Sequence, residues 1–382
     1  GEEINEKNAI IYLSNVLGRT VREVQLAMEK FRGSHIQNSL YHIAYWLGKR
    51  AIMESENSED REITFSAKLR ETVGQHNYGE QWANQIKRYL DENHLLSKPI
   101  HIVSANLHSF LNALYGFSAL GENCKSLEAL AVETSKEESV ALREKIRAYA
   151  RENGMGVLYD PSGTNLTVQV MDLSKVDLTN NAVPISIDSS HAPVIIVLDY
   201  AFGEQAYECM DELLKPYESD GLTYLNVRSV SIMGKAGILE GDKGDIMIPT
   251  AHVFEGTGDN YPFNNELCSE DFTGNGLGVY EGTMITVLGT SLQNRQVLDH
   301  FRTSTWNAVG LEMEGAHYQK AIQSAARIRR SISENVDVLY AYYASDNPLK
   351  TGKTLASGGL GAEGIRPTYL ITQKILEKIL PA

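Results

Sequence analysis

The spacing of apolar residues changes along the chain and divides it into two parts. Up to about residue 95, apolar side chains recur every three to four positions, which is the period of an amphipathic helix. One such stripe consists of Val24, Ala27, Met28 and Phe31. Beyond Pro99, short continuous apolar runs alternate with helical patterns, as in an α/β domain. We predict a helical N-terminal region over residues 1–97 and an α/β domain over residues 98–382.

The second part contains several apolar runs that predict strands, most of them followed by small or polar residues. These runs cover residues 100–103, 194–198, 227–233, 283–289 and 336–343. The run at 194–198 is continuous, which is typical of a strand buried on both faces. Residues 121–154 carry a helical pattern, and we predict that they form a helical insertion. A three-layer α/β fold with a mixed central sheet accounts for this alternation.

Two of the predicted strands end in carboxylates. The run at 308–311 leads through Met313 and Glu314 into a helix, and the run at 336–343 is followed by Ser345 and Asp346. Ligands of α/β sheets bind at the carboxyl ends of strands. We therefore predict that Glu314 and Asp346 form the centre of an active site.

A glycine-containing stretch follows another predicted strand. Residues 227–233 lead into Gly234, Lys235, Ala236 and Gly237. We predict a loop here, because glycines allow backbone N–H groups to approach a ligand closely.

The composition excludes several classes of protein. The net charge of −14 leaves no basic surplus for binding a nucleic-acid backbone. No apolar run reaches the roughly 18 residues of a membrane span, and no signal peptide opens the sequence. The three cysteines lie far apart, and the glycines at 274, 276 and 278 lack the preceding strand of a dinucleotide fingerprint. We expect a cytoplasmic protein without metal or cofactor, and without nucleic-acid or membrane partners.

Four motifs in the second part point to a family. They are Gly234-Lys235-Ala236-Gly237, Gly244-Asp245-Ile246, Glu312-Met313-Glu314-Gly315-Ala316 and Ser345-Asp346. In this order they resemble the nucleoside phosphorylase and nucleosidase superfamily over residues 99–382. The pattern is most similar to AMP nucleosidase and methylthioadenosine/S-adenosylhomocysteine nucleosidase. The resemblance implies a phosphorylase/hydrolase-like three-layer domain.

The resemblance also implies roles for the two acids and their neighbours. Glu314 resembles the glutamate that accepts hydrogen bonds from the ribose hydroxyls, and Met313 would pack under the sugar. Asp346 resembles the aspartate that protonates N7 of a leaving purine. Cleaving an N-glycosidic bond develops positive charge on the ribose and negative charge on the base, which suits these two groups. Glu312 is expected to face away from the site and make a structural hydrogen bond.

Further positions of the pocket follow from the same resemblance. His252 and Phe254 lie where the family builds the 5′ end of the pocket, and Leu292 stands where a phenylalanine stacks on the base. Lys235 is either an anion ligand or a salt-bridge partner. The remaining substrate-binding positions are Gly234, Ala236, Gly237, Gln293 and Ser345.

The chain departs from the family around the attacking nucleophile. Phosphorylases hold phosphate with an arginine in the first turn, another arginine before the small-residue loop, and a serine inside that loop. Here the turn at 105–109 has no arginine, Ile232 stands near the second position, and Lys235 replaces the serine. The glutamate with which nucleosidases activate water is also missing, and His108 or Ser109 lies near its place. We therefore treat His108 as a catalytic base or as a ribose contact.

Three functions agree with these residues. The favoured one is hydrolysis of the N-glycosidic bond of a nucleoside or nucleotide, with purine as the favoured base, by an enzyme of nucleoside metabolism. The second is a phosphorylase, a pentosyltransferase that takes inorganic phosphate as a further substrate and holds it with Lys235. The third is a regulatory protein that binds a nucleoside or nucleotide without turnover. The family builds its pocket partly from a neighbouring subunit, so we expect a homo-oligomer, either a dimer or a hexamer.

Overall fold

The computed structural model describes most of the chain. The described residues are 9–11, 13–14, 20–31, 40–57, 75–121, 126–159, 163–179, 183–187, 191–219, 221–288, 294–351 and 361–381. They form two compact units, the described residues up to 57 and those from 75 onward. Leu292 and Gln293, both predicted to bind substrate, lie outside the described residues.

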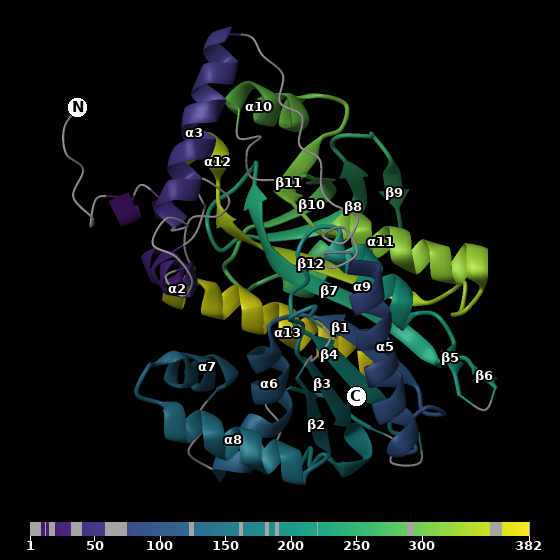
Figure 1. Ribbon diagram of the computed structural model, residues 1–382. Coiled ribbons are helices and arrows are strands. Elements are labelled where there is room, and N and C mark those ends of the chain that lie inside the picture. Colours follow the sequence, from purple (N-terminus) through teal and green to yellow (C-terminus); the bar gives the residue numbers. More distant parts are fainter. Residues whose placement is uncertain are drawn as a thin grey trace. The chain divides into compact units, whose positions relative to one another are not determined.

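The smaller unit is helical, as the apolar period predicts. Its helices are α2 (Val21–Phe31) and α3 (Leu40–Asn57), which are drawn in purple in Figure 1. A capping box starts α2: the Thr20 hydroxyl oxygen accepts the Glu23 N–H at 3.2 Å, and the Glu23 carboxylate accepts the Thr20 N–H at 2.8 Å. Apolar side chains of the predicted stripe, including Val24 and Met28, form the core of this unit.

The larger unit is organised around a ten-stranded sheet. Its strands are β1 (Ile100–Ser104), β2 (Met155–Leu158), β3 (Val168–Asp172), β4 (Val194–Leu198), β7 (Val227–Ile238), β8 (Ile246–Phe254), β9 (Asn260–Pro262), β10 (Val279–Thr286), β11 (Ala308–Glu312) and β12 (Asp337–Asp346). The order is β11-β10-β8-β12-β7-β1-β4-β3-β2, with β9 paired to β8. A separate hairpin joins β5 (Tyr217–Glu218) and β6 (Leu222–Thr223).

The sheet is mixed, and its parallel centre defines one functional edge. β12, β7, β1 and β4 run parallel, whereas β8 pairs antiparallel with β12 and β3 pairs antiparallel with β4. The carboxyl ends of the four parallel strands therefore point to the same edge of the sheet. The predicted α/β class with a mixed central sheet is confirmed.

Strand β7 is the longest strand and connects the two halves of the site. It continues to Ile238, so the predicted loop at Gly234–Gly237 is wrong: these residues pair with β12 instead. The end of β7 also pairs antiparallel with β11, which closes β7, β12, β8, β10 and β11 into a ring. Gly237 is opposite Asp346 on one side and opposite Leu311 on the other. One residue of β7 thus lies between β12, which ends in Asp346, and β11, which Glu314 follows by two residues.

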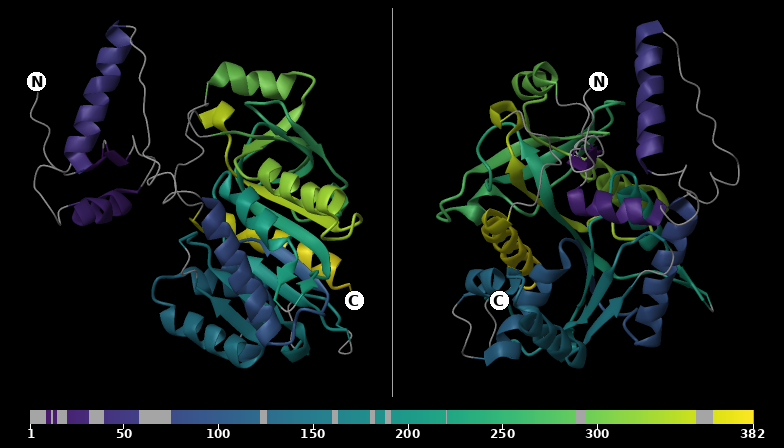
Figure 2. Two further views of the ribbon diagram at one scale, coloured as in Figure 1. Left: turned by 45° about the vertical axis from the view of Figure 1, so that its right-hand side comes forward. Right: turned by 60° about the vertical axis from the view of Figure 1, so that its left-hand side comes forward.

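Helices cover both faces of the sheet (Figure 2). Apolar side chains of α5 (Gln75–Glu92), α9 (Gln205–Leu213) and α11 (Gly315–Gln323) form one core with one face. On the other face, α6 (Leu107–Leu120), α7 (Leu127–Ser135), α8 (Val140–Glu152) and α13 (Ile365–Ile379) form a second core. Two shorter helices, α10 (Arg295–Thr303) and α12 (Pro348–Thr351), pack against each other. These layers match the predicted three-layer architecture.

The structure groups α5 with the larger unit, although its apolar pattern resembles that of the preceding helices. Trp82, Ile86 and Leu90 of this helix are buried in the core that α9 and α11 share. The division at residue 97 and the insertion at 121–154 stay predictions, and α7 and α8 occupy most of the latter stretch.

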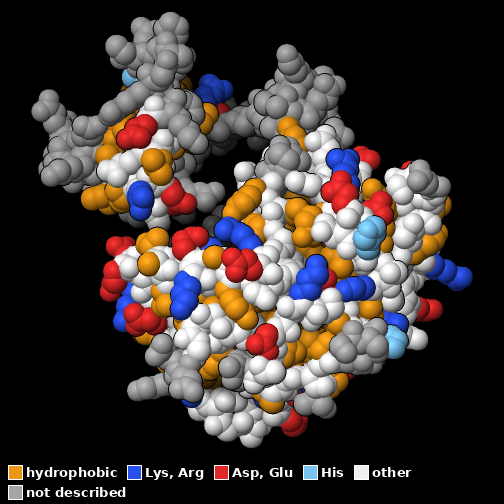
Figure 3. Space-filling model, turned by 90° about the horizontal axis from the view of Figure 1, so that it is seen from below, with side chains coloured by type: hydrophobic (Ala, Val, Ile, Leu, Met, Phe, Trp, Pro, Cys, Tyr) orange, Lys and Arg blue, Asp and Glu red, His pale blue; other side chains and the backbone are white. Residues whose placement is uncertain are grey.

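Two surface properties bear on possible partners. Acidic and basic side chains are interspersed over the face of the larger unit shown in Figure 3. Within the described residues, every helix is too short or too polar to cross a membrane.

Candidate active site

The turn between β11 and α11 is held by Glu312. This buried carboxylate accepts hydrogen bonds from the Glu314 N–H at 2.6 Å, from the Gly315 N–H and from the Thr286 hydroxyl. The N–H groups of Glu314 and Gly315 lie at the start of α11 and would otherwise lack hydrogen-bond partners. Burial, followed by the nearby Glu314 charge, raises the pKa of Glu312 to about 8. The predicted structural role of Glu312 is therefore confirmed by its contacts.

Glu314 is placed at the carboxyl-terminal edge of the sheet by this turn. Its Oε1 accepts the N–H of Gly203, which follows β4, at 3.0 Å. Burial raises the pKa of Glu314, while the N–H groups of Gly203 and Met313 and the Lys235 ammonium oppose the rise. Burial is the larger effect, so the net shift of the Glu314 pKa is upward, and the two N–H groups and Lys235 limit it.

Asp346 ends β12 and has one unsatisfied oxygen. The Ser345 hydroxyl lies 2.9 Å from its Oδ1 and 3.1 Å from the Ala236 carbonyl, and its single hydrogen can be donated to either. The buried Oδ2 atom has no hydrogen-bond partner within the described part of the chain. Burial raises the pKa of Asp346, against the opposing effects of Ser345, Lys235 and Lys243. A buried carboxyl oxygen without a donor favours the protonated form, which can itself donate.

Lys235 connects the two acids electrostatically. It lies on β7 with an exposed side chain, and its positive charge lowers the pKa of both Glu314 and Asp346. No salt bridge to Lys235 is formed by any described residue. The pairing of the nearby Gly237 with both β12 and β11 explains why the charge of one lysine acts on both carboxylates. The neighbouring Gly234 and Ala236 belong to the same strand.

His108 belongs to a different group of side chains at the same edge of the sheet. It lies in the first turn of α6, directly after β1, and is exposed. Its Nδ1 is 3.0 Å from the Tyr369 hydroxyl of α13. Burial by neighbouring groups lowers the pKa of His108, and the Asp199 carboxylate after β4 counteracts this. In the described chain His108 thus contacts Tyr369 and feels the charge of Asp199.

His252 and Phe254 are both buried, so they expose less surface than a side chain that lines an open pocket. His252 is 0% exposed; its Nε2 is 3.1 Å from the Tyr342 hydroxyl, and its ring stacks on Phe263 with centroids 5.2 Å apart. Burial lowers its pKa to about 3, so the ring is neutral. Phe254 is also buried and packs edge-on against His317. Substrate contact by either side chain stays a prediction.

Met313 lies between the two acidic residues and is half-buried. Its side chain packs against the apolar cluster formed by β8, β10 and β11, with Val253 and Ile285 among its members. The predicted contact of Met313 with a sugar is not tested by this packing.

Sequence reasoning missed the segment after β4. Gly203 supplies the N–H that Glu314 accepts, and Tyr200 interacts with Asn106 after β1 and Tyr343 of β12. A Cβ atom at Gly234 would lie 3.9 Å from the Tyr200 ring. The signal was available, because the apolar run at 194–198 predicts a parallel strand whose carboxyl end should also face a ligand.

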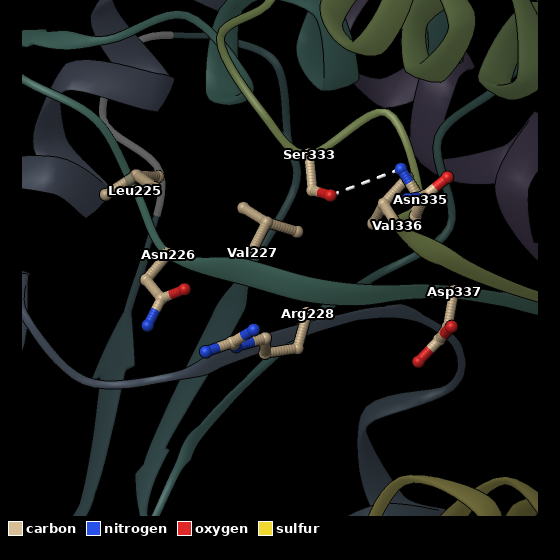
Figure 4. A pocket seen from close by; sticks show the side chains of 8 residues that line it. All are labelled: Leu225, Asn226, Val227, Arg228, Ser333, Asn335, Val336 and Asp337. Carbon is tan, nitrogen blue, oxygen red and sulfur yellow. Dashed lines mark hydrogen bonds between the residues drawn. The ribbon is translucent and has the colours of Figure 1, made fainter.

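A polar pocket lies at the other end of the parallel strands, away from the two acids (Figure 4). It is lined by Leu225, Asn226, Val227, Arg228, Ser333, Asn335, Val336 and Asp337. The Ser333 hydroxyl oxygen accepts the Asn335 N–H at 3.1 Å, as the dashed line shows. This pocket offers one carboxylate and one guanidinium. The pocket contains neither a pair of acids nor a carboxyl group suited to donate a proton. The carboxyl-terminal edge of the sheet is therefore the better candidate site.

No group of three or more histidine, cysteine or carboxylate side chains in the described chain is arranged to hold a metal ion. The two cysteines that the structure describes, Cys209 and Cys268, are not joined by a disulfide.

Comparisons with known proteins place the chain among families and folds. A model described as "Family of unknown function (DUF6909)" matches residues 129–381. No curated protein matches the sequence.

Similar solved structures include three nucleoside-cleaving enzymes. The 5′-methylthioadenosine/S-adenosylhomocysteine nucleosidase of Campylobacter jejuni is 12% identical, with 74% of this chain and 99% of that chain covered at a TM-score of 0.43. A futalosine hydrolase mutant of Helicobacter pylori is 12% identical, with 73% and 98% covered at 0.43. The AMP nucleosidase of Bacteroides thetaiotaomicron is 15% identical, with 72% and 91% covered at 0.37. All three belong to the nucleoside phosphorylase and nucleosidase superfamily that the motifs resemble.

Proposed function

The chain belongs to the family of unknown function DUF6909, and we propose that it hydrolyses the N-glycosidic bond of a purine nucleoside or nucleotide. The observation that carries the proposal is the unequal environment of two acids at one edge of the sheet. Burial raises the pKa of both carboxyl groups, but Asp346 has a buried oxygen without a donor, whereas backbone N–H groups oppose the rise at Glu314. One acid is thus suited to donate a proton and the other to remain charged.

The proposed reaction uses one protonated and one ionised carboxyl group. The bond between the ribose C1′ and the base nitrogen breaks with its electron pair leaving on the base. The protonated Asp346 carboxyl delivers its proton to the purine, which neutralises the departing base. The Glu314 carboxylate binds the ribose hydroxyls and stabilises the positive charge that develops on the sugar. Water then adds to C1′ and releases a proton, giving free base and ribose or ribose phosphate.

The phosphorylase alternative is supported by Lys235. This exposed ammonium acts on both carboxylates, whereas Lys243 acts on Asp346 alone, and it suits an anion such as inorganic phosphate or a substrate phosphate. A single lysine in place of two arginines and a serine favours hydrolysis, because fewer donors remain to orient phosphate as a nucleophile.

The first experiment measures free-base release from a panel of nucleosides and nucleotides, with and without phosphate. We expect release that does not depend on phosphate. Formation of ribose 1-phosphate would select the phosphorylase alternative. The absence of base release from any member, together with measurable binding, would favour a regulatory binding protein.

The second experiment tests the acid. Asp346→Asn can still hydrogen-bond the purine but cannot deliver a proton, so base release should slow by about 10²–10⁴-fold. Nitrophenyl riboside has a good leaving group and should be nearly unaffected, provided that the wild-type enzyme accepts it. Asp337→Asn is the matched control, because Asp337 is exposed at the other end of the same strand. Equal slowing of both substrates would show that Asp346 only shapes the pocket.

The wild-type pH profile gives an independent readout. Because Asp346 must be protonated, base release should fall as the pH rises through the raised pKa of this carboxyl. The fall should be absent with nitrophenyl riboside. We also propose that the enzyme is cytoplasmic and forms a homo-oligomer; a monomer by light scattering at micromolar concentration would contradict the assembly.

A further inference from the structure

A chain of hydrogen bonds ends on His108 and starts deep in the helical layer. The Thr134 hydroxyl of α7 is 2.9 Å from the Leu130 carbonyl, and Asn112 Nδ2 of α6 is 3.1 Å from the same hydroxyl. Asn112 Nδ2 also lies 2.7 Å from the Tyr369 hydroxyl, which in turn lies 3.0 Å from His108 Nδ1. Asn112, Thr134 and Tyr369 are buried, so water does not compete for these groups.

The first member of this chain sets the direction of the hydrogen bonds at Thr134 and Asn112. A backbone carbonyl only accepts, so the Thr134 hydroxyl must donate to Leu130. Its oxygen therefore accepts from Asn112, which requires the amide nitrogen at that position. The same NH₂ group supplies its second hydrogen to the Tyr369 oxygen.

The consequence for His108 follows from the single hydroxyl hydrogen of Tyr369. The Tyr369 hydroxyl is buried, so its hydrogen needs an acceptor within the protein, and among the hydrogen bonds of the described chain His108 Nδ1 is the acceptor, since Asn112 Nδ2 can only donate. A ring nitrogen that accepts carries no proton, so the neutral imidazole must hold its proton on Nε2. His108 thus presents an N–H group, and no lone pair, on the side of the ring away from α13.

We propose that His108 is a hydrogen-bond donor that binds an oxygen atom of the substrate through Nε2–H, and that it is not the base that activates water. The proposal rests on the proposed function, because the substrate is taken to bind at this edge of the sheet. Asn112 and Tyr369 act as positioning residues that fix the tautomer. The recognised oxygen belongs to a sugar hydroxyl or to a phosphate, since both accept from a neutral N–H group.

The supporting electrostatics agree with a neutral ring. Burial lowers the pKa of His108, and a second proton on Nδ1 would place two hydrogens between the ring and Tyr369. Asp199 is the negative group that opposes this effect.

Nitrogen-15 NMR of histidine-labelled protein tests the tautomer without any substrate. The shifts of the two ring nitrogens distinguish Nδ1–H from Nε2–H, and the His108 signals are assigned by their loss in His108→Gln. We expect the Nε2–H form in the wild-type protein and a mixture of forms in Tyr369→Phe. Tyr159→Phe is the control, because Tyr159 is 68% exposed and contributes nothing to this chain. The Nδ1–H form in the wild type, or an unchanged tautomer in Tyr369→Phe, would overturn the proposal.

Two probes identify the recognised oxygen. Ribose and inorganic phosphate are titrated separately while the His108 Nε2 signal is followed, and a shift with one of them selects the hydroxyl or the phosphate. If neither probe shifts the signal, His108 is not a substrate donor. This result would leave the proposed glycosidic cleavage intact, since that reaction is judged by base release alone.

Substitution of His108 separates a donor from a base. Glutamine places an amide N–H near the position of Nε2–H but cannot accept a proton in catalysis. We expect His108→Gln to retain base release within about tenfold of the wild type, the size of one hydrogen bond, and His108→Ala to lose more. Equal loss in both variants, in proteins that remain folded, would assign His108 as the base.

Discussion

Gly315 begins α11 at a point where the backbone touches two buried aromatic side chains. A Cβ atom added there would lie 2.3 Å from His252 Cδ2 and Nε2 and 2.6 Å from the Tyr342 hydroxyl oxygen. His252 is 0% exposed and Tyr342 is 3% exposed, so neither ring can move into solvent. The contact should therefore tolerate only glycine, and Gly315→Ala tests this directly.

The size of the effect follows from these distances. Carbon atoms in contact normally lie about 3.5–4.0 Å apart, so the start of α11 or the His252 ring must move by more than about 1 Å. Overpacking of this kind costs about 1–3 kcal/mol, and the better helix propensity of alanine recovers less than about 1 kcal/mol. We expect a net loss of about 1–2 kcal/mol in the free energy of unfolding.

The same displacement should reach the site, because Glu314 directly precedes Gly315. A misplacement of about 1 Å near the reacting groups lowers turnover by about 10²-fold. Urea unfolding measures the stability, and base release measures the turnover. Gly79→Ala in α5 is the matched control, because its added Cβ would meet its nearest atom at an ordinary 3.5 Å. It should be neutral or stabilising. If Gly315→Ala were as stable and active as this control, the packing argument would be wrong.

Two further predictions concern the charges of the site. Glu314→Gln keeps the shape of the side chain but removes its charge, so the activation barrier should rise by about 2–4 kcal/mol while the free energy of unfolding in urea changes little. Unchanged turnover would remove Glu314 from the site. Lys235→Ala should raise the pKa of both Glu314 and Asp346 and weaken the binding of an anionic substrate, which a comparison of nucleoside with nucleotide KM values would show. Equal KM changes for the two substrates would contradict the anion role.

The strands at the centre of the sheet could be predicted because their signal is local. The apolar runs at 100–103, 194–198 and 336–343 coincide with β1, β4 and β12 to within a few residues. The structural role of Glu312 and the position of Glu314 at the sheet edge could also be predicted from the sequence, because a strand that leads into a helix places its last residues at that edge.

The stretch Gly234–Gly237 could not be predicted correctly from local sequence. Two glycines in four residues favour a loop, and only the partners on both sides make it a strand. Those partners are about 75 to 110 residues away in the sequence, so neither periodicity nor composition reveals them. The burial of His252 has the same origin, because Phe263, Tyr340 and α11 enclose it only in the folded sheet.

Our prediction for the start of α6 is wrong, although the sequence contains the signal that places it. We expected a polar turn up to residue 109, but α6 begins at Leu107. Asn106 caps the helix, since its side chain accepts the Ser109 N–H at 3.0 Å. Asparagine is among the preferred N-cap residues, and this placement sets the position of His108 in the first turn.

The proposed difference between the two acids depends on their donors, because burial and Lys235 act on both in the same direction. Glu314 accepts backbone N–H groups that favour its charge, whereas Asp346 receives only the Ser345 hydroxyl, on one oxygen. Ser345→Ala removes that donor, so the pKa of Asp346 should rise further. A group that must be protonated then stays active to higher pH, and the alkaline fall in base release should move upward. The profile for nitrophenyl riboside should not move. A shift to lower pH, or no shift, would show that Ser345 does not support the ionised form of Asp346 and that another group sets its proton affinity.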